Sequence, residues 1–168
     1  SAQTPIADSI KYVEINFTAT DTDGADNLDD STAKAVATKD GFTRSSGTCT
    51  KTVIDSDTVK YNCSVPMNYY DPAGSWAINV SVSDLEGASA SNTENTFDFN
   101  ELLYISLSST LFGFGEFFPG DTGQAASSNP LLIDNLGNVN LSQINITAYD
   151  LVNGANVLGA TNITVNIS

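Results

Sequence analysis

The sequence predicts an all-β protein made of two antiparallel β-sandwiches in tandem. Apolar and polar residues alternate over several short segments. Val13, Ile15 and Phe17, for example, are separated by Glu14 and Asn16, and this period of two places apolar side chains on one face of a sheet. Turn residues separate the segments at regular spacing, and no segment has helical periodicity. A chain of 168 residues is long enough for one large β domain or two small ones.

The first half of the chain contains six candidate strands. They are residues 9–20, 32–38, 43–53, 58–66, 76–83 and 88–99. Between the first two lies the segment 21–30, DTDGADNLDD, whose Asp-rich composition opposes both helix and strand. The last two form a hairpin, in which residues 84–87 provide the turn.

Residues 88–107 join the two halves. No Gly/Pro linker follows the hairpin, and only Asn100 and Glu101 separate Phe99 from Leu102. The last strand of one sandwich therefore runs into the first strand of the next. We expect domains at residues 1–100 and 101–168 that move together as one stiff rod.

The two cysteines, Cys49 and Cys63, allow one intramolecular pairing. Folding residues 47–65 about Ser56 places Val53 opposite Val59 and Cys49 opposite Cys63. Directly opposed residues at a non-hydrogen-bonded antiparallel site have Cα atoms about 4.5 Å apart, within the range that a disulfide tolerates. We predict a cross-strand disulfide and an oxidising compartment; the alternative is two reduced, buried thiols.

The charge of the chain is one-sided. Twenty acidic residues face six basic ones, there is no His, and the net charge is −14. All the basic residues lie in the first 60 positions, so the rest of the polar surface consists of Ser, Thr, Asn, Gln and acidic groups. Nucleic acid and anionic lipid surfaces would be repelled, and the composition suits an extracellular location. No membrane span is expected.

The stretch YYDPAGSWAINVSVSDLEGASA, residues 69–90, carries a family resemblance. A turn with Gly74, an aromatic residue at Trp76, an alternating apolar strand, and Asp84 and Gly87 in the last hairpin resemble the end of immunoglobulin-like (Ig-like) modules. These are modules of the PKD or cadherin-like kind, which recur in archaeal and bacterial cell-surface and filament proteins. The resemblance covers residues 9–99 and implies a spacer or binding module without chemistry of its own.

The second half resembles another Ig-like family of surface proteins. Phe114-Gly115-Glu116-Phe117, Pro119-Gly120-Asp121-Thr122 and NLGNVNL at 135–141 are similar to its pattern FG-x-V-x-PG-x-T…N-x-GN-x-x-L. The resemblance implies core positions at Leu131, Leu132, Ile133, Ile144 and Ile146. Such a module has about seven strands in about 100 residues. Residues 101–168 are fewer and end on the strand-like run Ile163, Val165, Ile167, so we expect a sandwich that lacks its final strand or strands.

The Asp-rich segment is the best candidate for a metal site, because Ca²⁺ takes six to eight oxygen ligands. It is not an EF-hand: counted from Asp21, the Gly falls fourth instead of sixth, and position twelve is Thr32 instead of Glu. The favoured alternative is a solvated acidic turn without metal. Calcium is the one cofactor considered, and its candidate ligands are Asp21, Asp23, Asp26 and Asp29, with Asp84 or Glu86 from another turn.

Seven Asn-x-Ser/Thr sequons occur in the chain, which predicts N-glycosylation of at least one. The alternative is that strands alternating Asn, Ser or Thr with Ile or Val create sequons without any glycan. The seven are Asn16, Asn62, Asn79, Asn140, Asn145, Asn162 and Asn166.

Two groups of aromatic residues are candidates for binding. Phe112, Phe114, Phe117 and Phe118 form the densest cluster. Burial in a core is the default interpretation. Because a strand can bury only one of its faces, one or two of these rings would be exposed and available to a neighbouring subunit. A second group, Tyr69, Tyr70 and Trp76, would stack on a sugar ring in a carbohydrate-binding module, although turn and core roles are favoured.

The sequence favours a structural function over a catalytic one. Without His, and with paired cysteines and no phosphate-binding Gly loop, the usual groups for catalysis are missing, so we do not expect an enzyme. We expect a secreted subunit of an extracellular, pilus-like filament or surface layer. The alternative is a carbohydrate- or receptor-binding adhesin module of a larger surface protein, with glycans as partners.

A specific assembly mode is expected for the structural reading. The open edge of the incomplete second sandwich would accept the N-terminal strand of the next subunit, a head-to-tail contact that does not close and so makes a fibre. The predicted interface residues are Ile10, Val13, Ile15, Phe17, Phe112 and Phe114.

Overall fold

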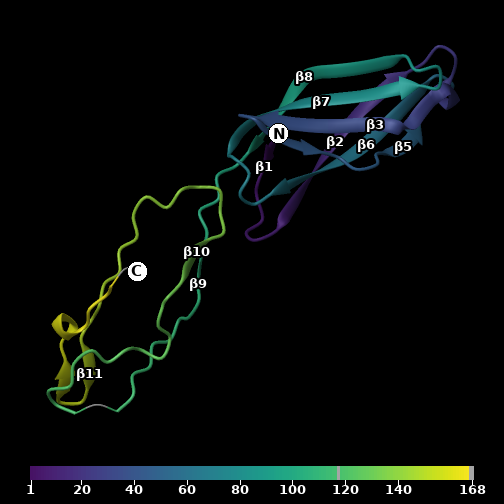
Figure 1. Cartoon of the computed structure of the whole chain (residues 1–168). Helices are drawn as coiled ribbons and strands as arrows, with labels where there is room; N and C mark the ends of the chain where they lie inside the picture. The colour runs from purple at the N-terminus through teal and green to yellow at the C-terminus, as the bar shows by residue number, and fades with distance from the viewer. Residues whose placement is uncertain (117, 167–168) are drawn as a thin grey trace.

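Strands dominate the computed structural model, which describes residues 1–116 and 118–166. The first 100 residues form two facing sheets, and the rest of the chain extends from one end of them (Figure 1). The helical elements of the described residues are two 3₁₀ turns, η1 (Ala25–Asn27) and η2 (Ala160–Asn162). The predicted all-β class is confirmed. In the part of the chain that the structure describes, no helix has the length and apolarity needed to cross a membrane.

The larger sheet has five strands in the order β1-β8-β7-β3-β4. They are β1 (Ala2–Gln3), β3 (Leu28–Lys39), β4 (Phe42–Ser45), β7 (Gly74–Asp84) and β8 (Ser89–Phe99). All neighbours are antiparallel except β1, which runs parallel to the last two residues of β8. The β7–β8 pair is the hairpin predicted from the alternation.

The smaller sheet has three strands in the order β2-β6-β5. They are β2 (Ile10–Thr20), β6 (Thr58–Asn68) and β5 (Thr50–Val53). The antiparallel β2–β6 ladder is continuous from the pair Ile10↔Asn68 to the pair Thr20↔Thr58. The predicted strands at residues 9–20 and 58–66 therefore form, and they pair with each other.

Two of the predicted strands differ from the structure. The predicted strand 43–53 is split, because the chain leaves the larger sheet after β4 and enters the smaller sheet at β5. Ser46 lies at this crossing, where its Oγ accepts a hydrogen bond from the backbone N–H of Ala35. Strand β3 begins at Leu28, inside the Asp-rich segment, because Leu28 is buried and Asp30 finds partners on the other sheet.

One apolar core lies between the two sheets. Strand β6 contributes its alternate residues from Val59 to Met67, each fully buried. From the larger sheet, Trp76 and Phe97 stack with ring centroids 6.4 Å apart, and Trp76 Nε1 donates to the carbonyl of Pro72 at 2.9 Å. The buried apolar residues are Val13, Ile15, Ala25, Leu28, Ala33, Ala35, Ala37, Cys49, Val59, Tyr61, Cys63, Val65, Met67, Trp76, Ile78, Val82, Phe97 and Phe99.

The predicted disulfide forms between Cys49 and Cys63, with Cα atoms 4.3 Å apart. The strand register around it is the predicted one, since Val53 lies opposite Val59 in the β5–β6 ladder. The bond ties the segment that enters β5 to the centre of β6. Both cysteines are buried, so the disulfide is part of the core.

A polar contact also joins the two sheets. The hydroxyl of Tyr61 on β6 donates to Asp30 Oδ1 on β3 at 2.6 Å, and Lys51 Nζ on β5 lies 3.1 Å from Asp30 Oδ2. Burial raises the pKa of Tyr61 above its ordinary value near 10, and the bond to Asp30 raises this pKa further. Tyr61 therefore stays protonated in the folded chain.

The second half shows no sandwich in its described residues, 101–116 and 118–166. It contains two antiparallel pairs, β9 (Ile105–Leu107) with β10 (Ile133–Asn135), and β11 (Leu151–Asn153) with β12 (Asn156–Leu158). No apolar side chain in these ranges is buried. The domain at 101–168 therefore stays a prediction, and Phe117 and Ile167 lie outside the described residues.

Removing the disulfide should destabilise the sandwich. We expect the double variant Cys49→Ala/Cys63→Ala to lose about 3 kcal/mol of unfolding free energy, because the unfolded chain regains the entropy of the closed loop. Urea denaturation followed by Trp76 fluorescence measures this loss. An unchanged urea midpoint would contradict the structural role assigned to the bond.

Alkaline pH should unfold the protein in a way that depends on Tyr61. The raised pKa stabilises the fold below about pH 10, and this contribution is lost as the pH rises further, because the unfolded chain then releases a proton that the folded chain keeps. Urea midpoints between about pH 8 and pH 11 should fall more steeply for the parent chain than for Tyr61→Phe. Equal slopes would show that Tyr61 does not control this dependence.

Candidate functional site

The Asp-rich segment folds as a hydrogen-bonded turn. Asp21 Oδ1 accepts from the backbone N–H of Asp23 at 3.0 Å, and Asp21 Oδ2 accepts from Asn27 Nδ2 at 3.2 Å. Asn27 Nδ2 also donates to Glu86 Oε2 at 2.8 Å, so an amide holds together the two carboxylates that we considered as calcium ligands. These are the local contacts expected of acidic turn residues.

Asp26 and Asp29, two further candidate ligands, do not complete a calcium site. Asp29 Oδ1 accepts from both the backbone N–H and the hydroxyl of Ser31, at 3.0 and 2.6 Å. Asp26 lies in the 3₁₀ turn η1. Among residues 1–116 and 118–166 the structure gathers no group of three or more His, Cys, Asp or Glu side chains that could hold a metal ion. It therefore does not assemble Asp21, Asp23, Asp26 and Asp29 into the proposed site.

The predicted glycosylation sites lie on the surface. Asn16 and Asn62 are direct neighbours in the β2–β6 ladder, Asn16 exposed and Asn62 half-buried. Glycosylation itself stays a prediction. The remaining sequon residues are all exposed: Asn79, Asn140, Asn145, Asn162 and Asn166.

The aromatic candidates separate clearly. Trp76 is fully buried, which makes it unavailable for stacking on a sugar and confirms its favoured core role. Tyr70, 56% exposed, packs edge-to-face on Tyr69 with centroids 5.1 Å apart. In the Phe cluster, Phe112 and Phe114 are exposed instead of buried, at 46% and 42%. Phe118 is 75% exposed as well.

The N-terminal strand lies in its own sandwich in this structure, and the interface at Ile10, Val13, Ile15 and Phe17 stays a prediction. Val13 is 2% exposed and Ile15 9% exposed, because β2 belongs to its own sandwich. Ile10 is exposed, and Phe17 is half-buried against the core. Donating residues 10–19 to another chain would empty the core of the donor, at a cost of about 2 kcal/mol for each large apolar side chain.

The open side of the sandwich is the strongest candidate site. Within residues 1–116 and 118–166, strand β2 pairs only with β6, and β8 pairs only with β7 except where β1 joins its last two residues. Between these two edges lie adjoining hollows of about 450 and 470 Å³ that share Phe17, Thr18, Val80 and Asn92. They make one continuous depression, here called the lateral groove, between residues 13–20 of β2 and residues 89–97 of β8.

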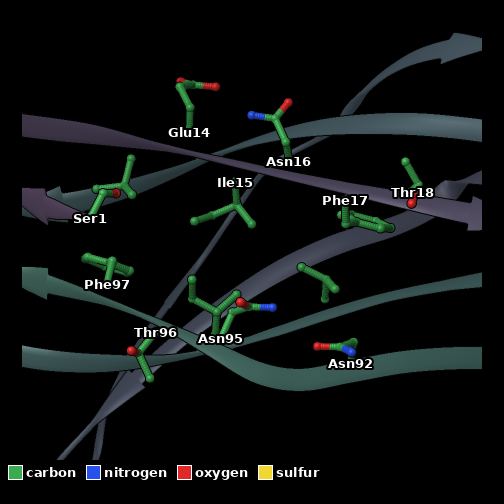
Figure 2. A pocket seen from close by; sticks show the side chains of 13 residues that line it. Ser1, Glu14, Ile15, Asn16, Phe17, Thr18, Asn92, Asn95, Thr96 and Phe97 are labelled. Atoms are coloured by element: carbon green, nitrogen blue, oxygen red, sulfur yellow. The ribbon is translucent and has the colours of Figure 1, made fainter.

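The lateral groove has an apolar floor and a polar rim. In Figure 2, Ile15 and Phe17 point from β2 toward β8, whereas Glu14 and Asn16 point away. On the opposite wall Asn92 pairs with Val80 and Asn95 with Ile78, which places both amides on the inner face of β8.

A further strand would cover these inner positions in a closed sandwich. Residues 89–96 of β8 are all exposed instead. The site therefore offers two unpaired backbone edges above a partly apolar floor, which is the geometry that accepts an extended peptide.

The lateral groove was not predicted from the sequence, although β8 contains a signal for it. Before Phe97, the strand reads SASNTENT and carries no large apolar residue on either face. A strand of a closed sandwich needs apolar residues on its inner face. The polar composition of β8 therefore indicated an uncovered inner face.

A polar joint connects the sandwich to the second half. The side chain of Asn138 donates to the backbone carbonyls of Asp71 and Asn100, at 3.1 and 3.0 Å, and accepts from the N–H of Leu102 at 2.7 Å. Gly137 packs so closely on Leu102 that an added Cβ would collide with the Leu102 carbonyl. The NLGN segment therefore holds the chain where it leaves the sandwich.

Substitution of Gly137 should loosen this joint. We expect Gly137→Ala to displace the loop, break the bonds of Asn138 and speed proteolytic cleavage between the halves several-fold. The matched control is Gly115→Ala, since an added Cβ there meets nothing within 4 Å. Limited proteolysis with mass mapping measures the effect, and cleavage of both variants at the parent rate would contradict it.

Comparisons of the chain with protein-family models, with curated protein sequences and with solved structures gave no match in any of the three.

Proposed function

We propose that this chain is a structural subunit of an extracellular filament or surface layer, and that it works by self-association instead of catalysis. The observation that carries the proposal is the unburied apolar surface of the second half. Among the residues that the structure describes, sixteen of the 24 exposed large apolar side chains lie in residues 103–165, whereas every buried apolar residue lies between Val13 and Phe99.

Exposed apolar surface on this scale favours association. A monomeric protein rarely exposes large contiguous apolar patches, because covering them is worth about 25 cal/mol per Å². One segment of the second half also lacks charge: residues 135–149 contain no Asp, Glu, Lys or Arg. A neighbour can therefore cover this segment without desolvating an ion, which makes other copies of the chain suitable partners.

The disulfide and the surface composition support an extracellular location. Disulfides persist in oxidising compartments, and Cys49–Cys63 is buried in the sandwich core. The polar surface is rich in Ser, Thr and Asn, and the sequon residues on it are accessible for glycans. A stiff polar joint at Asn138 suits a module that transmits tension along a polymer.

Self-association should depend on the exposed Phe residues of the second half. We expect Phe112→Gln/Phe114→Gln to raise the concentration needed for assembly roughly tenfold, which corresponds to a loss of about 1.4 kcal/mol of association free energy. Phe42→Gln is the matched control, because Phe42 is similarly exposed, at 44%, but lies in the first sandwich. The fold should tolerate all three changes.

Sedimentation velocity over a concentration series, with negative-stain images of the largest species, measures this assembly. Polymers that weaken in the double variant and persist in Phe42→Gln support the proposal. A parent chain that stays monomeric at all concentrations and binds glycans would overturn it in favour of an adhesin module.

A further inference from the structure

We infer that the lateral groove of one subunit receives residues 143–149 of a second copy as an added β-strand. This inference rests on the proposed function and specifies how the subunits join. It replaces the N-terminal strand, which the sandwich uses itself, with a different donor segment. It also places the acceptor in the first half of the chain.

The groove requires an extended, uncharged peptide with apolar residues on one face. Its two walls are the unpaired edges of β2 and β8, so the occupant must supply backbone hydrogen bonds along its length. Its floor includes Phe17 and Val80, which are only partly buried. The surrounding chain carries a net charge of −14, with Glu14 and Glu94 on the flanking strands, which disfavours an acidic occupant.

Residues 143–149, QINITAY, meet these requirements. Ile144, Ile146 and Ala148 alternate with polar residues, and the segment has no charge. Ile144 and Ile146 are 50% and 54% exposed. Within the described residues the segment belongs to no strand pair and makes no backbone–backbone hydrogen bond, so both its ladder edges and its apolar face are unpartnered.

The lengths of donor and acceptor agree. Seven extended residues span roughly 23 Å, and the free edge of β8 from Ser89 to Phe97 spans roughly 30 Å. Insertion would place Ile144 and Ile146 over the floor of the groove. The same register leaves Asn145 on the outer face, where a glycan would not block pairing.

A second copy, and not the same chain, is the occupant because of where the segment runs. After the joint at Asn138, the chain leads away from the sandwich, and the segment belongs to the second half, which extends from one end of the sandwich (Figure 1). The groove and the donor segment lie on different halves of the molecule. Their contact is therefore heterologous, and it builds a fibre when the rotation between successive copies does not close into a ring.

Paired substitutions test each face of the contact. In the donor, Ile146→Gln places an uncharged polar group on the apolar face, and its neighbour Thr147→Gln places the same group on the polar face. In the groove, Asn92→Lys fills the inner face of β8, and Asn79→Lys on β7 is its control, since Asn79 is exposed and lines neither hollow. All four residues are exposed, so the fold should survive each change.

We expect Ile146→Gln and Asn92→Lys to raise the assembly concentration by about tenfold, and both controls to stay within about twofold of the parent chain. Sedimentation velocity of the full chain, produced in a host that does not glycosylate, measures both. Unchanged assembly in Ile146→Gln and Asn92→Lys, with Phe112→Gln/Phe114→Gln still disruptive, would overturn this contact and leave the proposed function standing.

Cross-linking identifies the occupant. Both native cysteines are in the disulfide, so an introduced cysteine is the one free thiol of each variant. A Ser91→Cys chain mixed with an Asn145→Cys chain should form a mixed dimer with a short bismaleimide, whereas Thr52→Cys on β5, at the opposite edge of the smaller sheet, should not.

Two cross-linking results would overturn the inference. One is a link that forms only within a doubly substituted chain, which would mean that the segment folds back on its own groove. The other is equal linking by Thr52→Cys. If the parent chain neither assembles nor cross-links, the proposed function falls together with this contact.

Discussion

Strand β6 is the element on which the structure depends. Its alternate side chains from Val59 to Met67 are completely buried between the sheets. Its two edges are paired with β2 and β5, and Cys63 ties it covalently to the chain entering β5. Tyr61 also reaches Asp30 on the larger sheet. Hydrophobic burial, ladder hydrogen bonds and the disulfide therefore all meet on one strand.

This arrangement explains why one side of the sandwich is open. With β6 at its centre, the three-stranded sheet has β2 as an edge, and the larger sheet ends in β8 with only two residues of β1 beside it. The two unpaired edges lie on the same side of the molecule and form the walls of the lateral groove. An uncovered edge of this length is normally blocked or used, and the charged residues that line the two hollows are the acidic Glu14, Asp21 and Asp84.

The second half lacks an element equivalent to β6. Its short pairs, β9–β10 and β11–β12, leave their apolar side chains exposed or half-buried. The contacts of Gly137 and Asn138 hold only the part of the second half that adjoins the sandwich. Each copy of the chain has an uncovered apolar surface in its second half and an open groove in its sandwich. One copy can therefore cover the groove of another with its own apolar surface, and this is the physical basis of the proposed assembly.

The candidate site was less accessible to sequence reasoning than the fold. Alternation identified β2, β6, β7 and β8, but it could not show that residues 43–53 divide between two sheets, because both pieces have strand composition. It also suggested Val13 and Ile15 as interface residues, since an alternating strand has the same pattern in its own sheet and in a neighbour's. The apolar runs of residues 131–146 suggested a core, yet their side chains are exposed or half-buried in the structure.

The sequence by itself determined the all-β class, the β7–β8 hairpin and the Cys49–Cys63 disulfide, because each depends on a local period of two or on the register of one hairpin. Only the tertiary structure decided that β2 belongs to its own sandwich, that β2 and β8 are left as open edges, and that Asn138 closes the joint. These features depend on which distant strands become neighbours. That choice reflects the packing of the whole core, which no single segment encodes.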